Sequence, residues 1–280
     1  MKSDAESFYD LALASCGIAV MAKASCPGRT KTRLVPPLTF DEAAAFNTAF
    51  LRDVAANIAA ADERARGRNV RLAGYIAFGP PRSESFFREI LPASIGLIEA
   101  WYPNFGDCLF TAVEKLLALG HAGAVVLNSD SPTLPTALLA ETAEVLARPG
   151  DRAVLGPSTD GGYYLLGVKL PHRRLFEDVA WSTEVVARQT LERAAEIGLD
   201  VHVLPAWYDV DDIAALRLLR SELCDGVPFA PALTPHHAMH ARQLLGALLR
   251  ETDFAQRLVR ELGEGNSTDF ADPLMQRAAE

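Results

Sequence analysis

The chain has 280 residues, which is enough for one large α/β domain or two small ones. Apolar residues make up 49% of the chain, charged residues make up 22%, and the formal net charge is −9. The apolar content excludes disorder for most of the chain. The acidic balance argues against a nucleic-acid-binding protein, because neutralising phosphates needs an excess of basic residues.

Nothing in the sequence predicts a membrane span or a secretion signal. The longest apolar stretches, such as residues 122–127, fall far short of the roughly 18 residues that a spanning helix needs. Residues 1–10 lack the basic start and apolar run of a signal peptide. The four cysteines lie far apart without a C-x-x-C pair, so neither a disulfide framework nor a zinc site is expected. We therefore expect a cytoplasmic protein.

Apolar runs alternate with helical patterns along the chain, which is typical of a mostly parallel sheet with crossover helices. Strands are predicted at residues 17–22, 71–78, 96–101, 122–127, 152–155, 163–168 and 200–204, and helices at 39–61, 106–119, 133–147, 183–197 and 211–223. Thr39 and Glu42 have the spacing of a capping box, and Pro135 would lie in the first turn of its helix, where a missing N–H costs nothing.

The character of the sequence changes after Cys224. A Pro-rich linker is predicted at 225–235, one or two helices at 235–262 and a polar tail at 263–280. We therefore divide the chain into an α/β domain at 1–224 and a helical extension at 225–280. The added helices are a candidate contact for a homodimer or a candidate lid.

The segment after the first strand is basic. Lys23, Arg29, Lys31 and Arg33 place four cations within eleven residues of an acidic protein. Pro27-Gly28 lies among them, and a glycine turn allows close approach of backbone N–H groups to an anion. The segment fits a di- or triphosphate, although it lacks the P-loop spacing, and a solvated basic loop is the alternative.

Aspartates follow two other predicted strands. Asp130 comes directly after the fourth strand, and Asp209 and Asp211 follow the strand at 200–204. Ligands bind beyond the carboxyl ends of strands in such sheets, and Mg²⁺ takes one or two carboxylates together with substrate phosphates. The alternatives are that Asp130 caps a helix near Thr133 and that Asp211 belongs to an acidic helix start.

A Gly-rich string separates the strands at 152–155 and 163–168. Asp160-Gly161-Gly162-Tyr163 could border a ligand, and one tyrosine of Tyr163-Tyr164 would face the core while the other faces a pocket. A plain hairpin turn explains the glycines equally well. Trp181 is a further candidate for an acceptor pocket.

These strings in this order resemble the bacterial DUF2064 proteins, also called "transferase 1, rSAM/selenodomain-associated". The matching strings are Lys23 with Pro27-Gly28 and Lys31-Thr32-Arg33-Leu34, then Ser129-Asp130-Ser131-Pro132, then Gly156-Pro157 with Asp160-Gly161-Gly162-Tyr163-Tyr164, and Asp209-Val210-Asp211. The resemblance covers roughly residues 17–223. It implies a GT-A, Rossmann-like fold of the nucleotide-diphospho-sugar transferase superfamily, in three layers α/β/α with a mostly parallel mixed sheet. The family often has a Gln-x-Gly segment where this chain has Asn104-Phe105-Gly106-Asp107, so the preference for a base or acceptor can differ.

The residues and the resemblance together predict a metal-dependent transferase that acts on a nucleoside triphosphate or a nucleotide-sugar and a small acceptor. Asp130, with Asp209 or Asp211, would hold Mg²⁺ or Mn²⁺, and Lys23, Pro27, Gly28, Arg29, Lys31 and Arg33 would bind the phosphates. Lys31, Arg33 and Asp130 are the candidate catalytic residues, and Asp160, Gly161, Gly162, Tyr163 and Trp181 would contact the sugar or acceptor.

Two reactions remain open within this hypothesis. Glycosyl transfer is the usual label of the family. Nucleotidyl transfer is favoured by the basic loop and by Asn128, which stands where glycosyltransferases commonly have the first aspartate of Asp-x-Asp. The alternative of another class is a non-catalytic nucleotide-binding module with a GT-A core.

Overall fold

Strand β1 (Ala14–Lys23) is an interior strand of a seven-stranded sheet with the order β3-β2-β1-β4-β6-β5-β7. The computed structural model describes residues 14–264. The other strands are β2 (Val70–Gly79), β3 (Gly96–Glu99), β4 (Gly123–Leu127), β5 (Ala153–Pro157), β6 (Tyr163–Val168) and β7 (Val201–Val203). All run parallel to β1 except β6, which pairs antiparallel with β4 and β5. The expected mostly parallel mixed sheet is confirmed.

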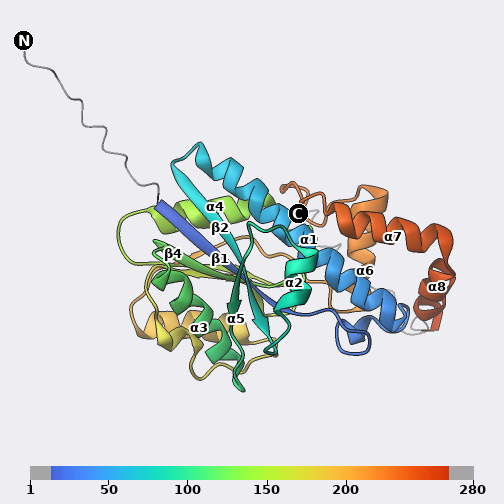
Figure 1. Cartoon of the computed structure of the whole chain (residues 1–280), viewed down its shortest axis with the longest axis horizontal. Coiled ribbons are helices and arrows are strands. Elements are labelled where there is room, and N and C mark those ends of the chain that lie inside the picture. The colour runs from blue at the N-terminus through green and yellow to red at the C-terminus, as the bar shows by residue number, and fades with distance from the viewer. Residues whose placement is uncertain (1–13, 265–280) are drawn as a thin grey trace, which may run out of the picture.

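Helices cover both faces of this sheet (Figure 1). They are α1 (Phe40–Arg66), α2 (Glu84–Ile90), α3 (Phe105–Ala118), α4 (Thr136–Ala147), α5 (Val186–Glu196), α6 (Ile213–Arg220), α7 (Met239–Glu251) and α8 (Phe254–Glu264). Side chains alternate along β1, so that Ile18 and Val20 join the core under α1 and α4 while Ala19 joins the core under α3. The three-layer α/β/α architecture is therefore confirmed, and it explains why β1 is an almost continuous apolar run.

The capping box predicted for the first long helix is confirmed. The Thr39 hydroxyl accepts from the Glu42 N–H at 3.2 Å, and the Glu42 carboxylate accepts from the Thr39 N–H at 2.7 Å. The helix that follows is longer than predicted and ends at Arg66 rather than near residue 61.

Three predicted helix starts or ends were wrong. Pro135 is the N-cap of α4 and not a residue of its first turn. Helix α5 begins at Val186, because the Thr183 hydroxyl donates to the Ala180 carbonyl instead of capping a helix. In place of the helix predicted at 211–223, α6 begins after its N-cap Asp212 and is α-helical only as far as Arg220. A π-helical turn, Ser221–Asp225, follows it directly. Helix α2 was missed because its seven residues are too short to show a periodic pattern.

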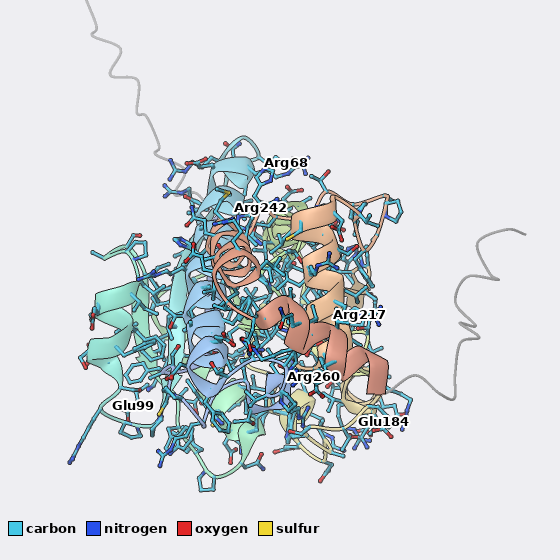
Figure 2. The ribbon with its side chains drawn as sticks, turned by 90° about the vertical axis from the view of Figure 1, so that its right-hand side faces the viewer. Arg68, Glu99, Glu184, Arg217, Arg242 and Arg260 are labelled. Carbon is cyan, nitrogen blue, oxygen red and sulfur yellow. The ribbon has the colours of Figure 1, made fainter. Side chains whose placement is uncertain are left out.

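The C-terminal helices α7 and α8 lie at one end of the molecule (Figures 1 and 2). Leu245 and Leu248 of α7 are buried in the same core as the inner face of α1. Asp53 of α1 accepts the N–H groups of His240 and Ala241, each at 2.8 Å, and so caps the start of α7. Of the one or two helices predicted for the extension, the structure has two. The domain boundary near residue 225 stays a prediction, and the predicted polar tail lies outside the described residues from position 265 onward.

No helix within residues 14–264 has both the length and the apolar character needed to cross a membrane.

Candidate active site

A cleft of about 650 Å³ opens at the carboxyl ends of β1, β2 and β4. This is the place where ligands bind in open α/β sheets. The predicted site residues that line it are Lys23, Arg29, Lys31, Arg33, Asp130, Asp160, Gly162, Tyr163, Asp209 and Asp211. The fold therefore brings residues from all four sequence strings to one cavity. Pro27, Gly28, Gly161 and Trp181 are not among the lining residues.

The basic segment is built on a tight turn. The N–H groups of Arg29 and Thr30 both donate to the Cys26 carbonyl, at 3.0 and 3.1 Å. Gly28 has φ of +73°, which explains the glycine, and a Cβ there would meet no atom within 4 Å. Gly28 thus serves the turn rather than a close contact within the described structure.

Lys31 has a buried ammonium that is surrounded by protein oxygens. Its Nζ lies 2.6 Å from Asp130 Oδ1, 2.8 Å from Asp211 Oδ1 and 2.8 Å from the Val210 carbonyl, and the side chain is 5% exposed. Burial by itself would lower the pKa of Lys31, but the two carboxylates outweigh it and raise the pKa above its ordinary value. These three acceptors match the three donors of an ammonium group. Lys31 therefore connects the basic segment to the segments that carry Asp130 and Asp211. A phosphate bound to Lys31, as the sequence analysis predicts, would have to compete with these bonds.

The other three cations of the basic segment are available to a ligand. Lys23, Arg29 and Arg33 line the cleft and form no ion pair within residues 14–264. Lys23 Nζ lies 6.0 Å from the centre of the Trp101 ring. Three cations that line one cleft without ion pairs among the described residues would attract a polyanion.

Four carboxylates, Asp130, Asp160, Asp209 and Asp211, line the same cleft. Burial, together with the negative charges of Asp160, Asp211 and Asp130, raises the pKa of Asp209 to about 7. Asp209 forms no ion pair with any described residue, whereas Asp130 and Asp211 share Lys31. The alternative role of Asp130 as a helix cap was wrong, since Pro135 occupies that place.

Two hydrogen bonds join the segment around Asp130 to the segment around Asp209. The Val210 N–H donates to the Asp130 carbonyl at 2.8 Å, and the Ser131 hydroxyl donates to the Tyr208 carbonyl at 2.9 Å. Asp130 and Asp209 are thus held at the same edge of the sheet although they are far apart in the sequence.

We call the four carboxylates Asp130, Asp160, Asp209 and Asp211 the acidic edge. Their oxygens are suitable ligands for a hard cation that also binds substrate oxygens. Within residues 14–264, no group of three or more His, Cys, Asp or Glu side chains is arranged to hold a metal ion by itself. Mg²⁺ often needs only one or two carboxylates, because waters and phosphates complete its shell. Asp130 and Asp209 supply such a pair, and a cation there would relieve the crowding of negative charge that raises the pKa of Asp209. Asp211 would have to give up Lys31 to act as a ligand.

The Gly-rich string is the hairpin that joins β5 to β6, as the plainer interpretation predicted. Gly161 has φ of +89°, and a Cβ there would lie 2.0 Å from the Glu184 carbonyl oxygen, so only glycine fits. The Gly162 N–H donates to Asp160 Oδ1 at 2.9 Å, which holds the turn. Asp160 nevertheless faces the cleft at the tip of this hairpin.

Tyr163 and Tyr164 divide as the alternation of a strand predicts. Tyr164 is fully buried and donates to the Pro205 carbonyl at 3.0 Å. Tyr163 lines the cleft, and its hydroxyl is buried without a hydrogen-bond partner among the described residues, as is Asn128 Oδ1. Buried polar atoms are normally paired, so these two atoms are candidate contacts for a ligand. Trp181 packs edge-on against the Tyr163 ring with centroids 6.4 Å apart and so supports it from behind.

The sequence analysis missed an aromatic rim on the cleft. Trp101, Tyr102 and Phe105 line the cavity and are 47%, 46% and 48% exposed, although such residues are usually largely buried. Trp101 rests on Gly79, where a Cβ would lie 2.1 Å from the indole ring. The available signal was the run of aromatic residues directly after a predicted strand.

Comparisons with known proteins agree with this architecture. Residues 63–183 match the family model described as "Uncharacterized protein conserved in bacteria (DUF2064)". The search of curated proteins found no match. A crystal structure from Desulfovibrio desulfuricans G20, described as a candidate nucleotide-diphospho-sugar transferase, is 24% identical with a TM-score of 0.69, and the match covers 88% of this chain and 97% of that chain.

Two more distant structures also match. CMP:2-keto-3-deoxy-manno-octonic acid synthetase complexed with CTP is 13% identical, with a TM-score of 0.46 and coverage of 76% of this chain and 100% of that chain. A cytidylyltransferase from Leptospira borgpetersenii is 10% identical, with a TM-score of 0.43 and coverage of 91% and 99%. The resemblance found in the sequence motifs is confirmed in that residues 63–183 match the DUF2064 family model and the chain shares its fold with the Desulfovibrio desulfuricans structure.

Proposed function

We propose that this protein is a metal-dependent transferase that binds the phosphates of a nucleotide substrate and transfers a nucleotidyl group to a small acceptor. The observation that carries the proposal is the division of charge across one cleft. Three cations without ion pairs among the described residues, Lys23, Arg29 and Arg33, line the same cleft as the carboxylates Asp130 and Asp209.

The division of charge suits the reaction. An acceptor oxygen attacks the α-phosphorus of a nucleoside triphosphate, a new P–O bond forms, and the bond to the leaving pyrophosphate breaks. Lys23, Arg29 and Arg33 would neutralise the charge that develops on the pyrophosphate. Asp130 and Asp209 would hold Mg²⁺ or Mn²⁺, which supplies Lewis-acid polarisation of phosphate oxygens. Positioning and electrostatics would then account for most of the rate.

Other residues of the cleft fit the rest of the two substrates. The exposed rings of the aromatic rim would stack on the planar base. Asp160, Gly162 and Tyr163, whose hydroxyl has no hydrogen-bond partner among the described residues, would contact the acceptor. Gly161 and Trp181 would shape this subsite indirectly, through the hairpin turn and through the Tyr163 ring.

Glycosyl transfer is the second candidate. It is supported by the description of the structural neighbour as a candidate nucleotide-diphospho-sugar transferase. In that reaction the acceptor attacks the anomeric carbon, and the nucleoside diphosphate leaves into the same basic segment. Asn128 weighs against it, because its amide nitrogen bonds the Ser131 hydroxyl at 3.1 Å and it offers no carboxylate beside Asp130.

Thermal unfolding with a panel of nucleoside triphosphates and nucleotide-sugars, with and without Mg²⁺ or Mn²⁺, separates these candidates. A ligand that binds the native state raises the melting temperature by mass action. We expect a metal-dependent rise with one triphosphate. A rise with one nucleotide-sugar and its diphosphate, but not with the triphosphate, would instead identify glycosyl transfer.

The Asp130→Asn variant separates an enzyme from a non-catalytic binding module. An enzyme should lose turnover with the identified substrate and keep its fold, and Asp151→Asn, which changes a carboxylate paired with His172, should keep turnover. Unchanged turnover in Asp130→Asn would refute the proposed catalytic metal site. The absence of any ligand-dependent rise would remove the support for the phosphate-binding segment.

A further inference from the structure

The segment between the cleft and α1 is rigid around Arg33. Lys31 fixes its start through Asp130 and Asp211. Leu34, fully buried, donates its N–H to the Lys31 carbonyl at 3.0 Å and accepts from the N–H of Leu38 at 2.9 Å. Arg33 itself is exposed, so its backbone is held while its guanidinium reaches the cleft.

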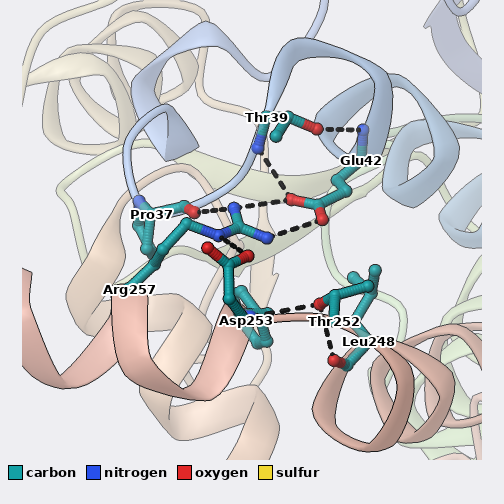
Figure 3. Close-up of polar contacts among 8 residues, drawn as sticks. Pro37, Thr39, Glu42, Leu248, Thr252, Asp253 and Arg257 are labelled. Atoms are coloured by element: carbon teal, nitrogen blue, oxygen red, sulfur yellow. Dashed lines mark hydrogen bonds and ion pairs between the residues drawn. The ribbon is translucent and has the colours of Figure 1, made fainter.

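The other end of this segment is held by the C-terminal helix α8, as Figure 3 shows. The Arg257 guanidinium bonds both carboxylate oxygens of Glu42, with Nη1 at 2.9 Å and Nη2 at 2.7 Å, and Nη1 also donates to the Pro37 carbonyl. Its Nε donates to Asp253 Oδ1 at 2.8 Å. The Arg257 and Glu42 side chains are only 19% and 14% exposed. Solvent therefore weakens this bidentate ion pair, the Arg257–Glu42 fork, less than it weakens a pair on the surface.

Glu42 connects this fork to the end of the basic segment. The same carboxylate accepts the Thr39 N–H at 2.7 Å and closes the capping box of α1. Arg257 therefore holds the chain at Pro37 directly and at Thr39 through Glu42. Arg257 does not line the cleft, so any effect on a ligand must pass through this backbone.

The linker before α7 contacts the acidic edge in a similar way. The His236 N–H donates to the Thr133 carbonyl at 3.0 Å. The Phe229 N–H donates to Glu222 at 2.8 Å, and the Tyr208 hydroxyl donates to the same carboxylate at 2.5 Å. The C-terminal part thus contacts the segment that follows Asp130 and, through Glu222, the segment that precedes Asp209.

We propose that residues 229–257 form a brace for the active site, and that Arg257 is a positioning residue that sets the place of the Arg33 guanidinium through Pro37 and Glu42. This inference rests on the proposed function, because it assumes that Arg33 binds phosphate. The competing explanation is that the Arg257–Glu42 pair only stabilises the start of α1.

Calorimetric titration of the whole chain tests the brace. The wild type is first titrated with inorganic pyrophosphate and with the common ribonucleoside triphosphates, each with Mn²⁺, and the tightest binder becomes the probe. Arg257→Gln should weaken the Kd of the probe about three- to tenfold, a fraction of what a charged hydrogen bond contributes. In an Arg33→Gln background, Arg257→Gln should cause no further loss, because Arg257 acts through Arg33.

Arg71→Gln is the matched control. It removes a guanidinium that bonds Asp62 at 2.9 and 3.3 Å near the opposite end of α1. It should lower stability without changing the Kd of the probe. Hydrogen exchange adds a readout without ligand: the amides of Leu34 and Leu38 should exchange faster in Arg257→Gln but not in Arg71→Gln. If Arg257→Gln does not fold, Arg257→Lys is the substitute, because lysine keeps the charge but cannot form the bidentate pair with Glu42. It should change the Kd of the probe and the exchange rates in the same direction, by smaller amounts.

The failures of the two proposals are distinguishable. No binding of any probe by the wild type would overturn the proposed function and the brace with it. Binding by the wild type with an unchanged Kd in Arg257→Gln would overturn the brace alone. Equal losses in Arg257→Gln and Arg71→Gln, or an undiminished loss in the Arg33→Gln background, would also overturn it and assign Arg257 a purely structural role.

Discussion

Replacing Lys31 with methionine should make the protein both less stable and more responsive to divalent metal. Methionine has a similar length and no charge, so the change leaves Asp130 and Asp211 without the cation that lies 2.6 and 2.8 Å from them. Asp209 already has its pKa raised to about 7 by burial and by these neighbouring charges. The acidic edge of Lys31→Met would therefore carry four carboxylates and no ion-pair partner from the described residues.

The size of the loss follows from burial. Breaking a fully buried pair costs about 3–5 kcal/mol, because one charge remains without a partner. Asp130 and Asp211 are 27% and 45% exposed, so water resolvates them in part. We expect a loss of about 1–3 kcal/mol, and hence a fall in melting temperature of about 3–10 °C for a chain of this size.

The assay is thermal unfolding with and without Mn²⁺, followed by direct Mn²⁺ titration. A divalent ion can replace the lost ammonium between the carboxylates, so Mn²⁺ should raise the melting temperature of Lys31→Met more than that of the wild type. Lys115→Met is the control, because the Lys115 ammonium donates to the Glu99 carbonyl at 2.7 Å and has no carboxylate partner within residues 14–264. An equal Mn²⁺ response in Lys31→Met and the wild type would refute the reasoning that Lys31 competes with metal.

Three further predictions concern the fold and the cleft wall. Burial alone would raise the pKa of Asp62, but hydrogen bonds, led by those from Arg71, lower it below its ordinary value. The contribution of Asp62 to the free energy of unfolding should therefore be complete above about pH 4 and should decline as the pH falls through the lowered pKa. Urea unfolding of Asp62→Asn should therefore show a loss of about 1–2 kcal/mol at pH 7 that shrinks at pH 3, and an equal loss at both would contradict this. Gly161→Ala should lose at least about 1–2 kcal/mol in the same assay, since φ is +89° and the Cβ would meet the Glu184 carbonyl; wild-type stability would show that the hairpin can shift. Tyr163→Phe should be neutral or more stable by about 1 kcal/mol, because it removes a buried hydroxyl without a partner, and a clear loss would mean that the hydroxyl is satisfied.

The sequence alone was sufficient for the class of fold and for most of the charged residues that line the cleft. Buried parallel strands appear as continuous apolar runs, and helix caps such as Thr39 with Glu42 depend on neighbours three residues away, so both are visible locally. The position of a residue beyond the end of a strand was enough to select Asp130 and the pair Asp209 and Asp211, because parallel strands present their carboxyl ends at one edge.

Only the tertiary structure decided how those residues divide their roles. Lys31 and Asp211 are separated by 180 positions, and their ion pair depends on how two segments fold back onto the end of one sheet. The same holds for Arg257 and Glu42, which are 215 positions apart and join α8 to the basic segment. Both arginine and lysine pair with whichever carboxylate the packing brings near, and no local pattern in the sequence encodes that choice. The sequence therefore determined which charges are present, and the packing of distant segments determined which of them remain free to meet a ligand.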